Sequence, residues 1–234
     1  MTKDRQKSEV IGIDSSYRTK KLVLLALITA MAYVVVFVFR MPIIPSVSFL
    51  SLELKSAIIL IGSFIFGPMS GFIMALVTSL LEMITISSTG VVGCIMNILA
   101  TSCFVCPAAF VYKKRKTTLS AATGLVIGTI LMTIVMVLWN YIITPIYMGI
   151  PREAIVELLL PAFIPFNLLK GAINSAVVML IYKFVLSVLQ KMNLIPTEQD
   201  SEKKGISSII GVIILSLLIL LTCVLIILAF NGVF

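Results

Sequence analysis

The chain has 234 residues, of which 60% are hydrophobic and only 12% are charged, and its mean hydropathy is +1.17. About a quarter of the residues in a soluble globular domain are charged, so this composition excludes that class and indicates a membrane protein. The net charge of +8 comes from lysines and arginines that cluster at the ends of apolar segments. That distribution is typical of residues that set membrane orientation, and it argues against nucleic-acid binding.

The first apolar segment, Leu22 to Phe39, follows a polar stretch, residues 1–21. As a helix it is long enough to cross a bilayer and too long for the core of a signal peptide, so we expect a retained first span. Ala26 and Ala30 lie four residues apart on it, close to Ala32. Such a face of small side chains allows another helix to approach closely, either inside the bundle or on a partner subunit.

Residues 48–87 are apolar but contain the letters FGPMSG in the middle. They form either one kinked helix or two spans joined by a turn at Gly67 and Pro68, and the Pro-Gly pair favours the turn. Charge supports two spans, because the basic cluster Lys113–Lys116 then lies on the cytoplasmic side with the N-terminus. The loop Pro151–Glu157 then lies outside, as the positive-inside rule requires.

Four further apolar runs cover residues 91–112, 120–147, 159–190 and 206–230. The sequence therefore predicts an all-α polytopic membrane protein: a bundle of six spans plus a seventh, C-terminal transmembrane helix, with the N-terminus cytoplasmic and the C-terminus outside. The predicted parts are a cytoplasmic polar N-terminus (1–21), a six-span membrane domain (22–192), a polar linker (193–205) and the additional helix (206–234).

Two stripes of polar side chains lie at similar depth in the fifth and sixth predicted spans. Asn167, Lys170 and Asn174 share one face of the sixth span, and Asn140 and Thr144 begin a similar stripe, continued by Tyr147, on the fifth. An unpaired lysine in the bilayer costs about 2.5–3.5 kcal/mol, so such residues usually face a cavity or a partner. The pattern predicts a pocket open to the outside for a hydrogen-bond-rich ligand that is neutral or has a partly anionic ring.

Other polar residues point to the same outer region: Asn97 near the outer end of the fourth span, and Glu53, Lys55 and Glu82 near those of the second and third. The alternative role for all these side chains is structural, with interhelical hydrogen bonds worth about 0.6 kcal/mol each and Lys170 paired to Glu82 or Glu53. Asn174 fits either role equally well.

The sequence favours a binding protein over an enzyme. It has no histidine and no phosphate-binding G-x-x-x-x-G-K-[ST] motif, so we expect no catalytic residue, metal site or cofactor, and any energy for transport comes from another subunit. Cys103 and Cys106 lack further metal ligands. A membrane enzyme would need an acid–base pair, for which only Glu82 and Lys170 are candidates.

Four stretches resemble the substrate-binding S component of energy-coupling-factor transporters: ALITA, FGPMSG, NYIITPIY (Asn140–Tyr147) and IPFNLLKG (Ile164–Gly171). The similarity covers about residues 20–192, and the last two stretches are most similar to the riboflavin-specific branch. The resemblance implies a six-helix bundle in the bacterial cell membrane that binds riboflavin near the outer surface. It also implies a transmembrane coupling subunit and two cytoplasmic ATPase subunits as partners, and toppling of the whole S component to carry the vitamin inward.

The resemblance implies residue roles as well. Asn140, Asn167 and Lys170 correspond to residues that bind the polar edge of the isoalloxazine ring, and we add Asn97 as a fourth substrate-binding candidate. The segment Leu50, Ser51 and Leu52 would cover the ligand, and the face formed by Ala26 and Ala30 would contact the coupling subunit.

Two departures from the family pattern, Lys55 and Glu82, leave another vitamin or a phosphorylated flavin open as the ligand. A structural membrane subunit without a small ligand is the alternative from a different class.

Overall fold

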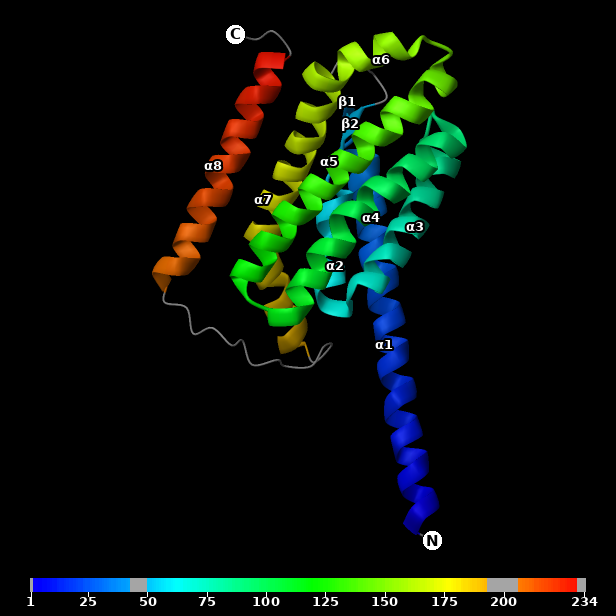
Figure 1. Cartoon of the computed structure of the whole chain (residues 1–234). Coiled ribbons are helices and arrows are strands. Elements are labelled where there is room, and N and C mark those ends of the chain that lie inside the picture. The colour runs from blue at the N-terminus through cyan, green and yellow to red at the C-terminus, as the bar shows by residue number, and fades with distance from the viewer. Residues whose placement is uncertain (1, 43–49, 193–205, 231–234) are drawn as a thin grey trace.

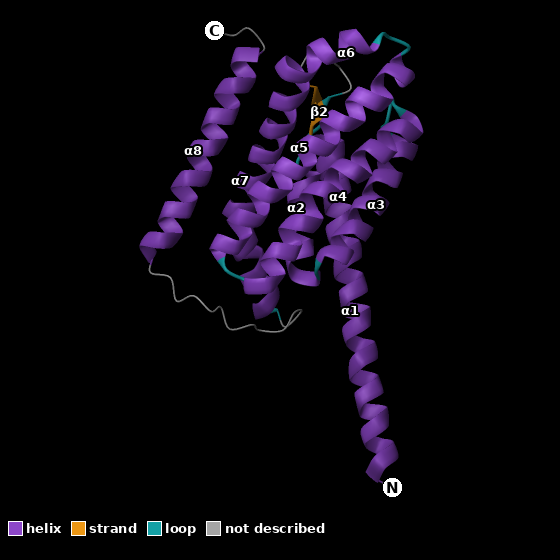
Figure 2. Cartoon of the chain, in the orientation of Figure 1, coloured by secondary structure: helices purple, strands orange, loops and turns teal. Residues whose placement is uncertain are grey.

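The computed structural model describes residues 2–42, 50–192 and 206–230, and these are almost entirely helical (Figures 1 and 2). The helices are α1 (Thr2–Val38), α2 (Lys55–Phe66), α3 (Pro68–Thr85), α4 (Gly90–Arg115), α5 (Thr118–Met148), α6 (Arg152–Leu158), α7 (Ile164–Lys191) and α8 (Ile206–Phe230), with a π-helical turn, Leu159–Phe163, between α6 and α7. Two short strands, β1 (Met41–Pro42) and β2 (Ser51–Leu52), pair in antiparallel fashion between α1 and α2.

Five of the described helical segments are long and apolar enough to cross a membrane, namely Arg18–Val38, Pro68–Thr85, Gly90–Arg115, Thr118–Met148 and Arg152–Lys191. Their outward side chains are large and apolar: Leu22, Ile84, Leu160 and Phe184 are each more than 65% exposed. Apolar side chains facing outward all round a helical bundle are what a lipid environment requires. The predicted all-α polytopic architecture is confirmed.

The chain turns sharply between α2 and α3 at Gly67. The φ angle of this residue is +92°, a conformation that glycine adopts without steric cost, and Pro68 opens α3 at a position where its missing N–H is not needed. The predicted turn at Gly67 and Pro68 is therefore confirmed, and the alternative of one long kinked helix is wrong. The first of the two predicted spans is represented by a helix of only 12 residues, α2, which is shorter than the five spanning segments.

The predicted sixth span is more complex than one continuous helix. It starts as the π-helical turn that contains Pro161 and continues as α7, and the short helix α6 directly before it occupies the segment Pro151–Glu157, which the sequence predicts to be a loop. Because proline has no N–H and clashes with the preceding turn, a local widening of the helix accommodates it. The seventh helix, α8, has the predicted bounds and packs against α7 at the edge of the bundle (Figure 1). The predicted linker, 193–205, lies outside the described residues.

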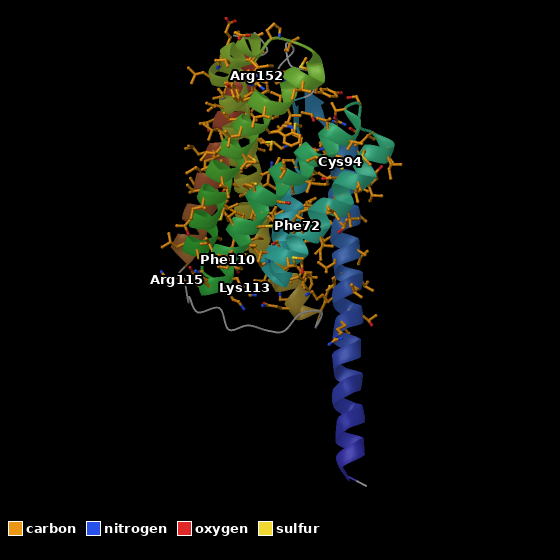
Figure 3. All side chains as sticks on the ribbon, turned by 45° about the vertical axis from the view of Figure 1, so that its right-hand side comes forward. Phe72, Cys94, Phe110, Lys113, Arg115 and Arg152 are labelled. Atoms are coloured by element: carbon orange, nitrogen blue, oxygen red, sulfur yellow. The ribbon has the colours of Figure 1, made fainter. Side chains whose placement is uncertain are left out.

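Labelled basic residues mark the two ends of the bundle. Lys113 and Arg115 lie at one end and Arg152 lies at the opposite end (Figure 3). The strands and α6 are at the Arg152 end, which we call the α6 end, and the N-terminal part of α1 projects beyond the bundle at the other, which we call the lysine end (Figure 1).

The core lies between α1, α2, α3, α4, α5 and α7, and its closest helix pair is α4 and α5. A Cβ added at Gly124 would lie 2.7 Å from the Ala108 carbonyl oxygen, and one at Gly128 would collide with the Phe104 carbonyl oxygen. Small residues allow such close backbone contact. Near the lysine end, the rings of Phe64 and Tyr112 stack with centroids 4.3 Å apart.

Candidate functional site

A small opening at the α6 end is bounded by the end of α1, by β2, and by α4, α5 and α7. We call it the polar opening. Six of the seven substrate-binding candidates line it: Leu50, Ser51, Asn97, Asn140, Asn167 and Lys170. The fold thus brings together side chains that lie far apart in the sequence. Leu52, the seventh, does not line the opening and packs instead against an apolar cluster that includes Phe163 and Phe166.

Asn140 and Asn167 are both buried, and each donates a hydrogen bond to its own helix. Asn167 Nδ2 donates to the Phe163 carbonyl oxygen at 2.8 Å, and Asn140 Nδ2 donates to the Met136 carbonyl oxygen at 2.7 Å. Asn140 Oδ1 also accepts from the Thr144 hydroxyl at 2.9 Å. Asn167 Oδ1 has no hydrogen-bond donor among the described residues, so it is an acceptor that a ligand in the opening can use.

Lys170 lines the polar opening and is paired at the same time. Its Nζ donates to Glu53 Oε1 at 2.8 Å, and both side chains are buried. Of the two pairings considered from the sequence, the one with Glu53 is present and the one with Glu82 is not. An ammonium carries three hydrogens, so Lys170 keeps donors for a ligand while Glu53 compensates its charge.

Lys55 and Glu82, the two departures from the family pattern, contact each other and do not line the opening. Lys55 Nζ lies 2.7 Å from both carboxylate oxygens of Glu82 and 3.1 Å from Glu53 Oε1. Lys55 is fully buried (0% exposed). It therefore offers no exposed charge to a ligand phosphate. Glu82 Oε2 also accepts a hydrogen bond from Asn97 Nδ2 at 3.0 Å.

Asn174, the third member of the sixth-span stripe, forms hydrogen bonds to three backbone groups. Its Oδ1 accepts from the Ala57 N–H at 2.9 Å, and its Nδ2 donates to the carbonyl oxygens of Glu53 at 3.1 Å and Lys170 at 2.9 Å. It does not line the polar opening. This geometry favours the structural role for Asn174, because it fixes the start of α2 against α7.

The loop between α1 and α2 reaches the opening through β2. Leu50 is buried among apolar side chains, and the hydroxyl of Ser51 accepts a hydrogen bond from Arg40 Nε at 3.2 Å. The centre of this loop, 43–49, lies outside the described residues.

Sequence reasoning missed Arg40, Phe166 and Met136, which also line the opening. Arg40 donates to Ser51 and, through Nη1, to the Ile86 carbonyl oxygen at 3.0 Å. Its position directly after the first apolar run is the one signal in the sequence, and an arginine there is usually a sign of membrane orientation. Phe166 and Met136 carry no signal that separates them from ordinary core residues.

The free space in the polar opening is about 20 Å³, enough for roughly one water molecule. A ligand with several rings therefore requires the lining side chains to move apart.

A second, larger cavity of about 550 Å³ lies between α5, α7 and α8. Its lining is mainly apolar, with Leu125, Ile130 and Leu168 among its members. None of the substrate-binding candidates lines it. It lacks the convergent polar groups that a hydrogen-bond-rich ligand requires.

The small residues of α1 face in two directions. Ala26 and Ala30 are exposed on the surface of α1, whereas Ala32 is completely buried in the core. Of the two roles considered for this face, Ala32 serves internal packing, and the surface at Ala26 and Ala30 remains uncovered by the described residues of this chain.

Comparison with known proteins gives concordant results. Residues 20–182 match the family described as ECF transporter, substrate-specific component. The riboflavin transporter RibU of Staphylococcus aureus is 34% identical over 75% of this chain and 95% of its own length. RibU of Streptococcus thermophilus is 33% identical over 74% of this chain and 86% of its own length. FmnP of Bacillus subtilis, also named a riboflavin transporter, is 30% identical over 70% of this chain and 91% of its own length.

A solved structure described as the S component of a bacterial ECF transporter superposes with a TM-score of 0.63 at 34% identity. The match covers 74% of this chain and 99% of that one. The sequence match, the superposition and the helix order agree, and the chain belongs to the family of ECF transporter substrate-specific components.

Proposed function

We propose that this chain binds riboflavin for an energy-coupling-factor importer and delivers it inward across a bacterial membrane. As a transporter component it is not an enzyme, and the vitamin is its cargo, not a cofactor. The observation that carries the proposal is the polar opening: Asn97, Asn140, Asn167 and Lys170 meet at one end of a chain that is 34% identical to a riboflavin transporter.

The chemistry of the opening suits the polar edge of a flavin. Asn167 Oδ1 is an available acceptor and Lys170 Nζ an available donor, and the apolar side chains of Phe166 and Met136 lie beside them. The isoalloxazine ring has an apolar body and one edge with an N–H group between two carbonyl groups. A pocket of apolar side chains with a few convergent polar groups fits such a ligand.

Transport requires partners. The chain contains no phosphate-binding motif, so we assign ATP hydrolysis to two cytoplasmic subunits and their connection to a transmembrane coupling subunit. The exposed surface at Ala26 and Ala30 on α1 supports a contact with that coupling subunit, since small side chains allow close helix approach. In the proposed mechanism the whole chain topples in the membrane with the vitamin bound.

For the orientation we propose a cytoplasmic N-terminus and an external C-terminus. Lys113 and Arg115 lie at the lysine end, from which α1 projects, and the polar opening lies at the α6 end. The positive-inside rule then places the lysine end in the cytoplasm and the opening outside.

The test is the colour of the protein. We expect the full chain, purified in mild detergent from cells fed riboflavin, to be yellow, with quenched flavin fluorescence that returns on denaturation. Titration of the protein with riboflavin and with its 5′-phosphate, after the bound flavin has been removed, then identifies the flavin. A preparation that stays colourless and quenches neither compound would contradict the proposal and leave another vitamin as the ligand.

A matched pair of variants on α7 tests the site. We expect Asn167→Ala to weaken riboflavin binding roughly tenfold, the loss expected when a buried hydrogen-bonding partner is removed. Ser175→Ala, two turns further along α7 and lining the apolar cavity, should bind like wild type. Equal affinities for the two variants would remove Asn167 from the site.

A further inference from the structure

Five side chains form a continuous series that begins and ends at the polar opening. Lys170 contacts Glu53 at 2.8 Å, Glu53 contacts Lys55 at 3.1 Å, and Lys55 contacts Glu82 at 2.7 Å. Glu82 then accepts from Asn97 Nδ2 at 3.0 Å. We call this series the ion-pair chain. Only its two ends, Lys170 on α7 and Asn97 on α4, line the opening.

We propose that the three inner members, Glu53, Lys55 and Glu82, are positioning residues that determine which ring edge the site accepts. They fix the hydrogen-bonding atoms that Asn97 and Lys170 present to the ligand. The preferred edge is uncharged and has an N–H donor beside a carbonyl acceptor, as in the imide of a flavin. This inference rests on the proposed function.

Glu82 fixes the orientation of the Asn97 amide. An ionised carboxylate only accepts hydrogen bonds, so the amide must direct its Nδ2 toward Glu82. Asn97 Oδ1, which has no donor among the described residues, then remains available as an acceptor. An amide side chain without such a neighbour can present either atom, and an acceptor at this place selects for a ligand N–H group.

Glu53 has the matching effect on Lys170. Glu53 accepts a hydrogen bond from the Lys170 ammonium and compensates its charge, and the other two N–H groups of the ammonium remain as donors for a ligand carbonyl. Across the ion-pair chain, the two lysines balance the two glutamates. A ligand therefore meets a strong donor without a net positive charge, and an uncharged ring suffices as its partner.

Stability alone gives little reason for such an arrangement. Buried ion pairs recover their desolvation cost poorly, and replacing them by apolar side chains of similar volume is often neutral or stabilising. All four charged members are at least nine-tenths buried, with exposures of 8% or less. Their connection at both ends to the opening indicates a role in recognition.

The test is a thermodynamic cycle between protein and ligand. The double variant Lys55→Met/Glu82→Gln removes one charge of each sign and keeps the Lys170–Glu53 pair, so no buried charge is left unbalanced. The amide introduced by Glu82→Gln offers both a donor and an acceptor, so it no longer dictates the orientation of Asn97. The ligands are riboflavin and its 3-methyl derivative, in which the imide N–H is blocked.

The measured quantity is the ratio of the two dissociation constants. The steric effect of the methyl group is present in both proteins and cancels in the comparison. We expect the preference for riboflavin to fall by roughly fivefold or more in the double variant, the loss expected for one hydrogen bond. The control is Ser79→Ala, about one turn before Glu82 on α3. Its buried hydroxyl has no hydrogen-bond partner among the described residues, and its preference should not change.

Each outcome decides the question. A double variant that binds both ligands more weakly by the same factor would show a purely structural ion-pair chain and overturn the inference, with the proposed function intact. If the double variant does not fold, Asn97→Leu, which keeps all ion pairs, should lower the ratio in the same way, and an unchanged ratio there overturns the inference as well. Wild-type protein that binds no riboflavin would instead overturn the proposed function and this inference with it.

Discussion

Asn174 is the residue on which the local structure around the polar opening depends most directly. Its side chain joins the start of α2 to α7 through two hydrogen bonds, from the Ala57 N–H and to the Glu53 carbonyl oxygen, and donates a third within α7 to the Lys170 carbonyl oxygen. We expect Asn174→Ala to lower the free energy of unfolding by about 1–3 kcal/mol, because the two buried hydrogen bonds between α7 and the start of α2 are lost and the Ala57 N–H keeps only its longer bond, 3.2 Å, to the Leu54 carbonyl oxygen. Thermal unfolding in detergent would measure this.

Thr78→Val is the matched control for Asn174→Ala. The Thr78 hydroxyl is fully buried and has no partner among the described residues, so an apolar replacement of the same shape should leave stability unchanged or raise it. An Asn174→Ala variant as stable as wild type would show that water or a neighbouring group replaces its hydrogen bonds.

At the scale of residues, the sequence located side chains better than it located their partners. Helical spacing placed Asn167 and Lys170 on one face, and both line the opening. The partner of Lys170 remained open between Glu53 and Glu82, because that choice depends on how α2, α3 and α7 approach one another. Arg40 was missed because an arginine after an apolar run is usually an orientation signal.

The contact between α4 and α5 is the clearest case in which an element depends on one position. At Gly128 an added Cβ would collide with the backbone of Phe104, and backbone cannot move aside as a side chain can. We expect Gly128→Ala to lower the melting temperature, although alanine favours a helix over glycine by about 1 kcal/mol.

Gly62→Ala provides the control on α2. There the added Cβ would meet the end of the flexible Met74 side chain at 2.8 Å, which can rotate away. We expect its melting temperature to be close to that of wild type. If both variants melted alike, close α4–α5 contact would not be a requirement of the fold.

At the scale of elements, hydropathy and loop charges predicted the spans because both act along the chain. They separated α2 from α3 at Gly67, and they gave the bounds of α8. They did not predict the π-helical turn at Leu159–Phe163 or the two-residue strands, because those details depend on how the chain packs at the α6 end.

For the whole molecule, binding and transport should be separable. A large side chain at Ala30, as in Ala30→Trp, would block close approach of another helix to the exposed face of α1. We expect this variant to bind riboflavin like wild type in detergent and to lose riboflavin uptake in cells that contain the coupling and ATPase subunits. Ile127→Trp, at an exposed position on α5, is the control and should retain uptake. Normal uptake by Ala30→Trp would exclude Ala30 from the coupling contact.

The role of α8 is also a question about the whole molecule, and a chain ending at Met192 tests it. None of the residues that line the polar opening belongs to α8, which packs on α7 through side chains such as Cys223 and Ile219. Lipid chains are as apolar as these side chains, so they can cover the freed face of α7 at little cost. We expect the shortened chain to fold and to bind riboflavin with unchanged affinity. Its melting temperature should be only slightly lower than that of the full chain. Loss of binding would instead mean that α8, acting through the buried contacts of Ile173 and Leu169, holds the start of α7 and its polar side chains in place.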